Sequence, residues 1–378
     1  MNEHIEEAIN EFRREGRRYA KTERYYRGDH DLAFATEKFA NTFGSLFREF
    51  AMNLCPAVCD AVRDRLRVAG FAGEAGEAAE AIWRRTRMPI RSGEVHREAL
   101  VNGDAYVIVW PDEAGRAAIY PQRAANCTAI YDDEHPGRVL RAAKHWRTAD
   151  GRTRLNLFYP DRIERFITAK AGEAALPEAR EFVPFMEAGG RMANPFGTVP
   201  VFHFANNADI GARGRSELEA AIPVQDGLNK AVLDMLVAME FSAYRQRWAA
   251  GIEIEYDNEG NAVAPFKAGV DHLWVTENPN ARFGDFETAG LDQFIKVKDS
   301  FRIDVASVTG TPMYYLMPHT RGFPSGDALR RAESRLAAKV RDRQAAFGHT
   351  WAEAMAFALR IEGRGAEVET RWEAVDDR

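Results

Sequence analysis

The residues of this 378-residue chain that could do chemistry do not fall into the spacings that known reactions require. A phosphate-binding loop has the pattern Gly-x-x-x-x-Gly-Lys-Ser/Thr, which the sequence lacks. The nine histidines include no His-Glu-x-x-His pair that could bind zinc. Gly322-Phe323-Pro324-Ser325-Gly326 is out of register for a nucleophile elbow, in which single residues separate the serine from both glycines. We therefore expect no catalytic residue.

Two acidic groups are candidates for metal binding or proton transfer. Asp132-Asp133-Glu134 falls in a predicted turn, where a solvated loop is the alternative interpretation. Asp29 and Asp31 flank His30 and could form an acid–base group, or they could simply begin a loop. We favour the structural interpretation for both groups, and the sequence predicts no metal site and no cofactor.

Cys55 and Cys59 lie four residues apart on a predicted helix, without a Cys-x-x-Cys pattern or a nearby histidine pair. We interpret them as buried, small apolar residues and not as metal ligands. The chain has only three cysteines, which is typical of a reducing compartment.

Six cations follow one another on a predicted helix near the end of the chain, and only Glu333 and Asp342 oppose them within that stretch: Arg330, Arg331, Arg335, Lys339, Arg341 and Arg343. They could form a solvated helix face, or they could contact neighbouring subunits or DNA. The formal net charge of the chain is −6, which argues against a sequence-specific DNA-binding protein. A channel through which DNA must slide is compatible with an acidic subunit, because many phosphate contacts would trap the polymer.

Residues 216–361 predict the helices that would position these cations. The helix over 223–247 would be about 38 Å long and repeats apolar residues at spacings of three and four, namely Leu228, Val232, Met235, Leu236, Met239 and Ala243. A second helix has the stripe Phe294, Val297, Phe301, Val305 and Val308 and ends at Gly310. A third, over 326–361, follows a Gly/Pro/aromatic loop.

The rest of the chain predicts a helical layer followed by an antiparallel sheet, which is an α+β arrangement. Helices are expected at 5–26, 46–69 and 75–101, the last range broken near Met88-Pro89. Alternating residues predict strands at 106–110, 117–120, 128–131, 139–146, 154–159, 163–167 and 199–204. Residues 169–198 are rich in Ala, Glu, Gly and Pro and predict a surface excursion.

Several of these segments together resemble the portal proteins of tailed bacteriophages, in particular those of siphophage-like viruses and actinobacterial prophages. The resemblance covers nearly the whole chain in the same order. It is carried by Tyr25-Tyr26-Arg27-Gly28-Asp29-His30, by 53–71, by Trp83 and 98–107, by 228–248, and by 325–329 with 347–351.

The resemblance implies the portal-protein fold, with an α/β wing, a helical stem, a small β-rich clip, a channel loop and a long basic helix. The implied division is wing 1–214, stem helix 215–248, clip 249–288, second stem helix 289–310, channel loop 311–325, long wing or crown helix 326–361 and C-terminal strand or tail 362–378. The clip also follows from the alternation at 252–256, a turn at 257–261 and a second strand near 272–276. Family members generally continue into a helical crown, which residues 362–378 do not predict.

The resemblance further implies a ring-forming structural subunit, twelve-fold in the virion, that provides the channel for packaging and ejecting double-stranded DNA without reading its sequence. The implied partners are further copies of the chain, terminase, a head–tail adaptor and the major capsid protein or scaffold, with no membrane. The expected location is the virion, assembled in the host cytoplasm. The alternatives are another ring-forming virion protein, such as a head–tail adaptor, and a nucleic-acid enzyme such as a nuclease.

Two sets of residues are the candidate sites. The DNA-channel set is His319, Thr320, Arg321, Lys296, Lys298 and Arg302, of which Arg321 is expected to meet phosphate. An ordinary connector on the outer surface is the alternative for the loop. The subunit-interface set is Phe294, Ile295, Phe301, Ile303, Tyr314 and Tyr315. Ile295 and Ile303 lie opposite Phe301 on the predicted helix, so one subunit cannot bury all three.

Overall fold

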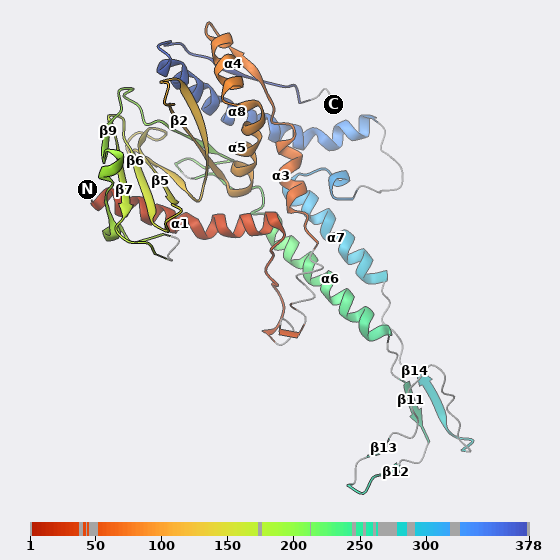
Figure 1. Ribbon diagram of the computed structural model, residues 1–378. Helices are drawn as coiled ribbons and strands as arrows, with labels where there is room; N and C mark the ends of the chain where they lie inside the picture. Colours follow the sequence, from red (N-terminus) through yellow and green to blue (C-terminus); the bar gives the residue numbers. More distant parts are fainter. Residues whose placement is uncertain are drawn as a thin grey trace.

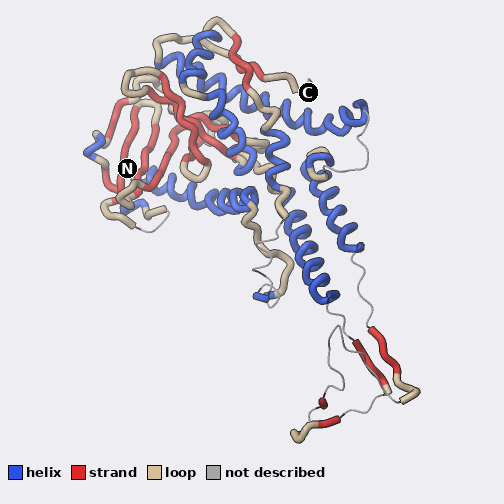
Figure 2. Tube along the Cα trace, turned by 45° about the vertical axis from the view of Figure 1, so that its right-hand side comes forward, coloured by secondary structure: helices blue, strands red, loops and turns tan. Residues whose placement is uncertain are grey.

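The computed structural model describes residues 2–37, 41–42, 44, 52–172, 176–211, 213–243, 247–251, 255–259, 262–263, 278–285, 292–317 and 326–375. Figure 1 shows a body of helices and sheets, from which two helices project side by side towards a small group of strands. The segments in Figure 2 have the same arrangement, with the strands of the body gathered on the side away from the projecting helices.

The N-terminal helix α1 (Asn2–Arg27) packs on one face of a six-stranded antiparallel sheet. Its apolar side chains Ile5, Ile9 and Phe12 are buried against Leu155 and Phe166 of the sheet, as the amphipathic pattern predicts. The strands of this sheet are β4 (Cys127–Tyr131), β5 (Val139–Arg147), β6 (Thr153–Phe158), β7 (Arg162–Thr168) and β8 (Phe182–Pro184), with β9 (Arg191–Ala193) also paired to β7.

The single sheet expected from the sequence is two sheets. The second has three strands in the order β10 (Val201–Ala205), β2 (Asp104–Pro111) and β3 (Ala117–Arg123). Strand β10 pairs with β2 across about a hundred residues of chain, which a local pattern cannot reveal. The predicted surface excursion at 169–198 is also partly wrong. Its described residues form β8, β9 and two 3-10 turns, η1 (Ala179–Glu181) and η2 (Met186–Ala188), which extend the six-stranded sheet.

Residues 46–51 of the helix expected over 46–69 lie outside the described residues, and within 52–69 the helix is shorter than predicted. Helix α3 (Cys55–Arg63) begins with Pro56 in its first turn, where a proline costs no hydrogen bond. The chain then forms β1 (Val68–Ala72), which pairs with β15 (Glu369–Trp372). Helices α4 (Gly76–Arg85) and α5 (Met88–Asn102) follow, and the break predicted near Met88-Pro89 is confirmed.

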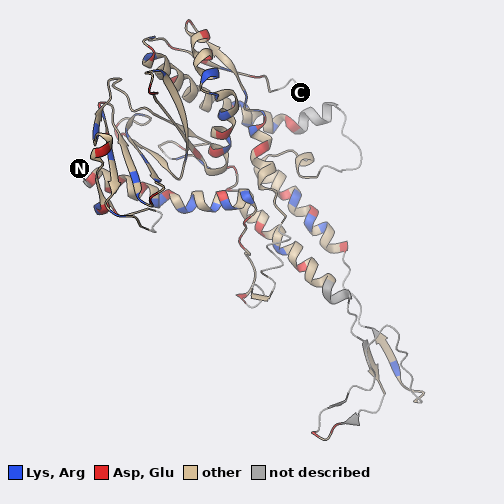
Figure 3. Ribbon diagram, viewed as in Figure 1, with Lys and Arg blue, Asp and Glu red and all other residues tan. Residues whose placement is uncertain are grey.

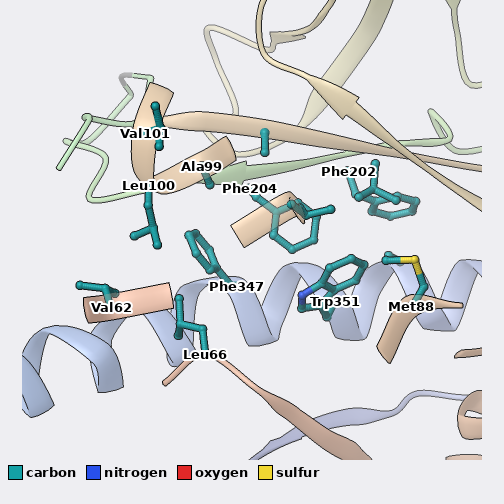
Figure 4. Close-up of a cluster of buried hydrophobic side chains, with 14 of the residues drawn as sticks. Val62, Leu66, Met88, Ala99, Leu100, Val101, Phe202, Phe204, Phe347 and Trp351 are labelled. Atoms are coloured by element: carbon teal, nitrogen blue, oxygen red, sulfur yellow. The ribbon is translucent and has the colours of Figure 1, made fainter. Parts of the chain in front are cut away.

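The main hydrophobic core surrounds the long helix α8 (Gly326–Ile361), whose predicted bounds are confirmed. Figure 4 shows Phe347 and Trp351 on α8 facing Phe204 of β10, with Leu100 and Val62 nearby. Side chains from α3, α4, α5, β2 and β10 complete this core. The core therefore depends on a helix that comes late in the sequence.

The two projecting helices are α6 (Ala221–Ala243) and α7 (Asp292–Thr309), and the 3-10 turn η3 (Met313–Tyr315) follows α7. Beyond their far ends lie the strand pairs β11 (Arg247–Ala250) with β14 (Arg282–Asp285), and β12 (Glu255–Tyr256) with β13 (Ala262–Val263). The predicted strand near 272–276 lies outside the described residues. None of the described helices combines the length and apolar character needed to cross a membrane.

Candidate functional site

The two projecting helices are held together by a large side chain packed on a glycine. A Cβ atom on Gly227 of α6 would lie 2.7 Å from Cε1 of Phe301, so the ring rests directly on the α6 backbone. Phe301 thus contacts the neighbouring helix of its own chain. A glycine at this position lets α6 and α7 approach closely.

Beside this contact and on the far side of the helix, α7 carries apolar side chains that the described residues of the subunit leave uncovered. Their exposed fractions are 50% for Ile295, 42% for Val297, 53% for Ile303 and 45% for Val308. The stripe expected from the sequence is therefore only partly correct: Val305 is buried and Phe294 and Phe301 are half-buried, but Val297 and Val308, expected on the same side, are exposed. In their place, the half-buried side of α7 carries Lys298 and Arg302.

Helix α6 carries apolar side chains on more sides than the described parts of the subunit cover. Leu228 and Leu233 are buried, and Met239 is 46% exposed. Apolar side chains between them are only half-buried, namely Val232, Met235, Leu236 and Val237. Apolar residues on several sides of a helix are normally buried, so the described part of a single subunit leaves the second half of α6 incompletely covered.

The C-terminal end of α7 is bonded to α8 through cations of the basic stretch, for which the sequence alone indicates no partner. Glu217 accepts hydrogen bonds from Lys339 Nζ (2.7 Å) and from an Arg343 Nη (2.9 Å). Lys339 also donates to the carbonyl of Thr309, the last residue of α7, at 2.6 Å. Burial alone would raise the pKa of Glu217, but the charges of Lys339 and Arg343 outweigh it and lower that pKa.

A cavity of about 420 Å³ lies at this junction, and Arg335 also lines it. Arg335 donates to the carbonyl of Ser307 at 2.8 Å, so it too satisfies the last turn of α7. The solvated-face interpretation is therefore wrong for Lys339 and Arg343, which are used inside the subunit. Side chains of Arg330 and Arg331 lie outside the described residues.

Ser216 ties the chain that leads into α6 to the end of α5. The Ser216 hydroxyl accepts from the amide of Leu218 at 3.0 Å and donates to the carbonyl of Val101 at 2.5 Å. The chain makes turns at 217–220 before α6 begins at Ala221. This geometry frees Glu217 to reach α8.

A buried polar network in the body was not predicted, although Asp104 belongs to one of the recognised segments. The Asp104 carboxylate accepts from His203 Nε2 (2.7 Å), from the Tyr19 hydroxyl (2.8 Å) and from the Gly214 amide (2.8 Å). Burial works to raise its pKa, but the hydrogen bonds and the charge of His203 lower it to about 2. Asp104 is fully buried, so this Asp–His pair joins α1, β2 and β10 and has no access to a substrate.

The acid–base alternative at His30 is also wrong. His30 is buried, its ring stacks on Tyr25, and its Nδ1 accepts from the Asn229 side chain at 2.7 Å. The Tyr25 hydroxyl donates to Asp226 at 2.6 Å, so this N-terminal motif holds the base of α6 to the end of α1.

The described residues contain no group of His, Cys, Asp or Glu that could bind a metal ion. Cys55 and Cys59 are buried, as predicted, and burial raises the pKa of the Cys55 thiol to about 12. Asp132 lies in an exposed turn, where its carboxylate accepts from the amide of Glu134 at 2.9 Å.

Comparison with known families decides the identity. Residues 59–376 match the family described as "Phage portal protein, SPP1 Gp6-like". The chain belongs to this portal protein family. It is 27% identical to the "Portal protein" of Mycobacterium phage L5 over 322 residues, which covers 80% of this chain and 63% of the relative. The "Portal protein" of Mycobacterium phage D29 gives 27% identity over 325 residues with the same coverage. The chain thus spans less than two thirds of the length of these portal proteins.

Two solved structures share the fold of this chain. The chain matches "Neck of empty GTA particle computed with C6 symmetry" with a TM-score of 0.53 and 14% identity, covering 88% of this chain and 85% of that one. "Neck of native GTA particle computed with C12 symmetry" gives a TM-score of 0.50 and 14% identity, with coverages of 88% and 84%. At this identity the likeness supports the fold alone, which is α+β as expected.

The portal-type channel residues expected from the sequence are only partly described. His319, Thr320 and Arg321 lie outside the described residues. Lys296 is exposed and Lys298 half-buried on α7, and neither forms an ion pair within the described part of the chain. Arg302 lies 3.4 Å from Asp299 and its Nε is buried without a hydrogen-bond partner. Figure 3 shows these charges mixed with acidic residues along α7.

The remaining portal-type contact residues lie at both ends of α7. Phe294 is half-buried near the start of the helix. After the helix, the rings of Tyr314 and Tyr315 lie 4.7 Å apart. The Tyr314 hydroxyl donates to Glu333, which also pairs with Arg65 at 2.9 Å. Tyr315 packs against the main core, so both tyrosines have partners in their own chain.

Proposed function

We propose that this chain is a portal subunit that assembles into a closed ring at a capsid vertex and provides the channel for packaging and ejecting double-stranded DNA. The observation that carries the proposal is the projecting pair of α6 and α7, whose uncovered apolar sides call for neighbours on both flanks. A contact between two different surfaces closes into a ring when its rotation permits. In this role the chain is a structural subunit of the virion and not an enzyme.

The proposed ring has twelve copies, and its wing, stem and clip follow the ranges given above. The body then corresponds to the wing, α6 and α7 to the stem, and β11–β14 to the clip. Terminase and a head–tail adaptor would dock in turn at the clip, while the major capsid protein or scaffold would surround the wing. Support comes from the family and from the position of β11–β14 at the far end of the stem helices (Figure 1).

Contact with DNA is assigned to the loop at 311–325, with His319, Thr320 and Arg321 at its centre, and to Lys296, Lys298 and Arg302 on α7. The start of the loop is anchored, because Arg335 and Lys339 of α8 donate hydrogen bonds to the last carbonyls of α7. Such a loop is held at a fixed radius in a ring, where a cation can meet phosphate without reading sequence. Arg321→Glu should therefore preserve the ring and reduce DNA packaging or retention.

Ring formation is tested most directly on the outer face of α7. Ile303→Asp places a charge on the proposed contact, and it should convert rings into monomers or small oligomers. Ile90→Asp makes the same chemical change on an α5 side chain that is 77% exposed, and it should leave rings intact. The readouts are native mass spectrometry and particle class averages viewed down the axis.

Salt should favour assembly, because twelve copies carry a formal charge of 12 × −6 = −72. The proposal fails if the unmodified chain stays monomeric at high protein concentration and about 0.5 M salt, where charge repulsion is screened over a few ångströms. It also fails if Ile303→Asp forms the same rings as the parent.

A further inference from the structure

The face of the six-stranded sheet that lies opposite α1 carries cations and aromatic rings in register. Lys144, Asn156 and Arg165 face one another across β5, β6 and β7. Next to them, Trp146 lies opposite Arg154, and Phe185 follows β8 beside Arg165. Directly opposed residues point to the same side of a sheet. We call Lys144, Trp146, Arg154, Arg165 and Phe185 the basic sheet patch.

Two cations of this patch lie over its aromatic rings. The guanidinium carbon of Arg154 lies 4.9 Å from the centre of the Trp146 ring and 4.1 Å from that of Phe185. Lys144 Nζ lies 4.9 Å from the centre of Trp146. Arg165 donates to the carbonyl of Ala188 at 2.6 Å, which fixes its side chain. The cations are therefore preorganised, and the edges of the guanidinium groups remain as hydrogen-bond donors.

These cations lack the anions that normally accompany half-buried charges. Within the described residues, no carboxylate forms an ion pair with Lys144, Arg154 or Arg165, in contrast to most arginines of the body. Burial lowers the pKa of Lys144, and burial together with the neighbouring Arg165 lowers that of Arg154. Nε of Arg154 and Oδ1 of Asn156 are buried without any hydrogen-bond partner. Unsatisfied buried groups are costly, so a partner is favoured that brings an acceptor for the Arg154 guanidinium and a donor, such as a backbone N–H, for Oδ1 of Asn156.

We propose that the basic sheet patch binds the carboxylates of an acidic protein segment. The planar fork of an arginine matches a carboxylate, and three adjacent cations can receive neighbouring Asp or Glu side chains. Single-stranded nucleic acid is the competing class of partner, and it binds by stacking bases on exposed aromatic faces. Here Lys144 and Arg154 already occupy ring faces of Trp146 and Phe185, which favours an acidic protein segment. This site lies on the body and does not depend on the proposed channel.

The test uses a fluorescein-labelled hexaglutamate peptide and fluorescence anisotropy on the full chain at low salt. The combined variant Lys144→Gln, Arg154→Gln and Arg165→Gln should bind the peptide at least about tenfold more weakly than the parent, the equivalent of losing one charge-assisted hydrogen bond. The matched control is Arg17→Gln, Lys170→Gln and Arg180→Gln, three exposed cations elsewhere on the body, and it should bind like the parent. The corresponding hexaglutamine peptide should not bind.

A second variant tests the same site if the triple variant fails to fold. Arg154→Lys keeps the charge and removes the fork, so it should weaken binding by an intermediate factor while thermal unfolding stays close to that of the parent. Equal loss of peptide binding in the patch variant and in the control variant would overturn the proposal. So would a short oligothymidylate that binds through the patch while hexaglutamate does not, because that result assigns the patch to nucleic acid.

Discussion

His96 shows how one buried side chain can make the stability of the body depend on pH. Trp351 Nε1 donates to His96 Nε2 at 2.9 Å, and His96 Nδ1 lies 3.1 Å from the carbonyl of Leu66. The neutral ring, with its proton on Nδ1, satisfies both contacts. A second proton would point at the indole N–H, and complete burial lowers the pKa of His96 to about 4.

We expect this histidine to weaken the folded state as pH falls. The unfolded chain takes up a proton near the ordinary pKa of 6.5, whereas folded His96 resists it down to about 4. The contribution of His96 to the free energy of unfolding is therefore complete above pH 6.5, and about 3 kcal/mol of it is lost as the pH falls to about 4. The free energy of unfolding can be measured in urea at a series of pH values. His96→Gln should remove this part of its pH dependence, since an amide does not titrate and can still donate one hydrogen bond and accept the other. An unchanged slope in His96→Gln would show that other groups cause it.

At the scale of the element, the packing of α6 on α7 rests on one position. Gly227→Ala would place a methyl group 2.7 Å from Phe301 and should cost about 1–3 kcal/mol by overpacking. Phe301→Leu frees part of that space, so the double variant should recover some of the lost stability. Denaturant midpoints of the two single variants and the double variant measure this coupling. Strictly additive losses would mean that the two residues do not meet.

Elements with a strong local period could be predicted from the sequence, and contacts between distant elements could not. Helix α8 was predicted with its bounds, because its apolar residues repeat over many turns. Glu217 was missed because its partner Lys339 lies 122 residues further along the chain. The orientation of α7 was predicted only in part. Phe301 and Val305 of the expected stripe face the subunit, but Val297 and Val308 are exposed, because the contact of Phe301 with Gly227 sets the side that faces α6.

At the scale of the whole molecule, the β-strands beyond α6 and α7 are separate from the core. The hydrophobic clusters of the described residues draw on the body and on the bases of the two helices, and not on β11–β14. Deleting residues 257–262, which follow β12 and include the first residue of β13, should therefore leave the thermal unfolding of the body and ring assembly unchanged. Binding of terminase or of the head–tail adaptor should decrease. Full packaging and adaptor docking by the deletion variant would refute the assignment of these strands to the clip.

The pairing of β1 with β15 has a consequence for biosynthesis. Val68 pairs with Trp372, so this two-stranded sheet closes a loop of 372 − 68 = 304 residues. Closing so long a loop costs roughly 5 kcal/mol of chain entropy. Phe347 and Trp351 of α8 also contact residues that are synthesised much earlier. During translation, the apolar surfaces of α3, α5 and β2 must wait for α8 to emerge from the ribosome. Nascent chains should thus bind chaperones until α8 is available, and subunits should become competent to associate only after that step.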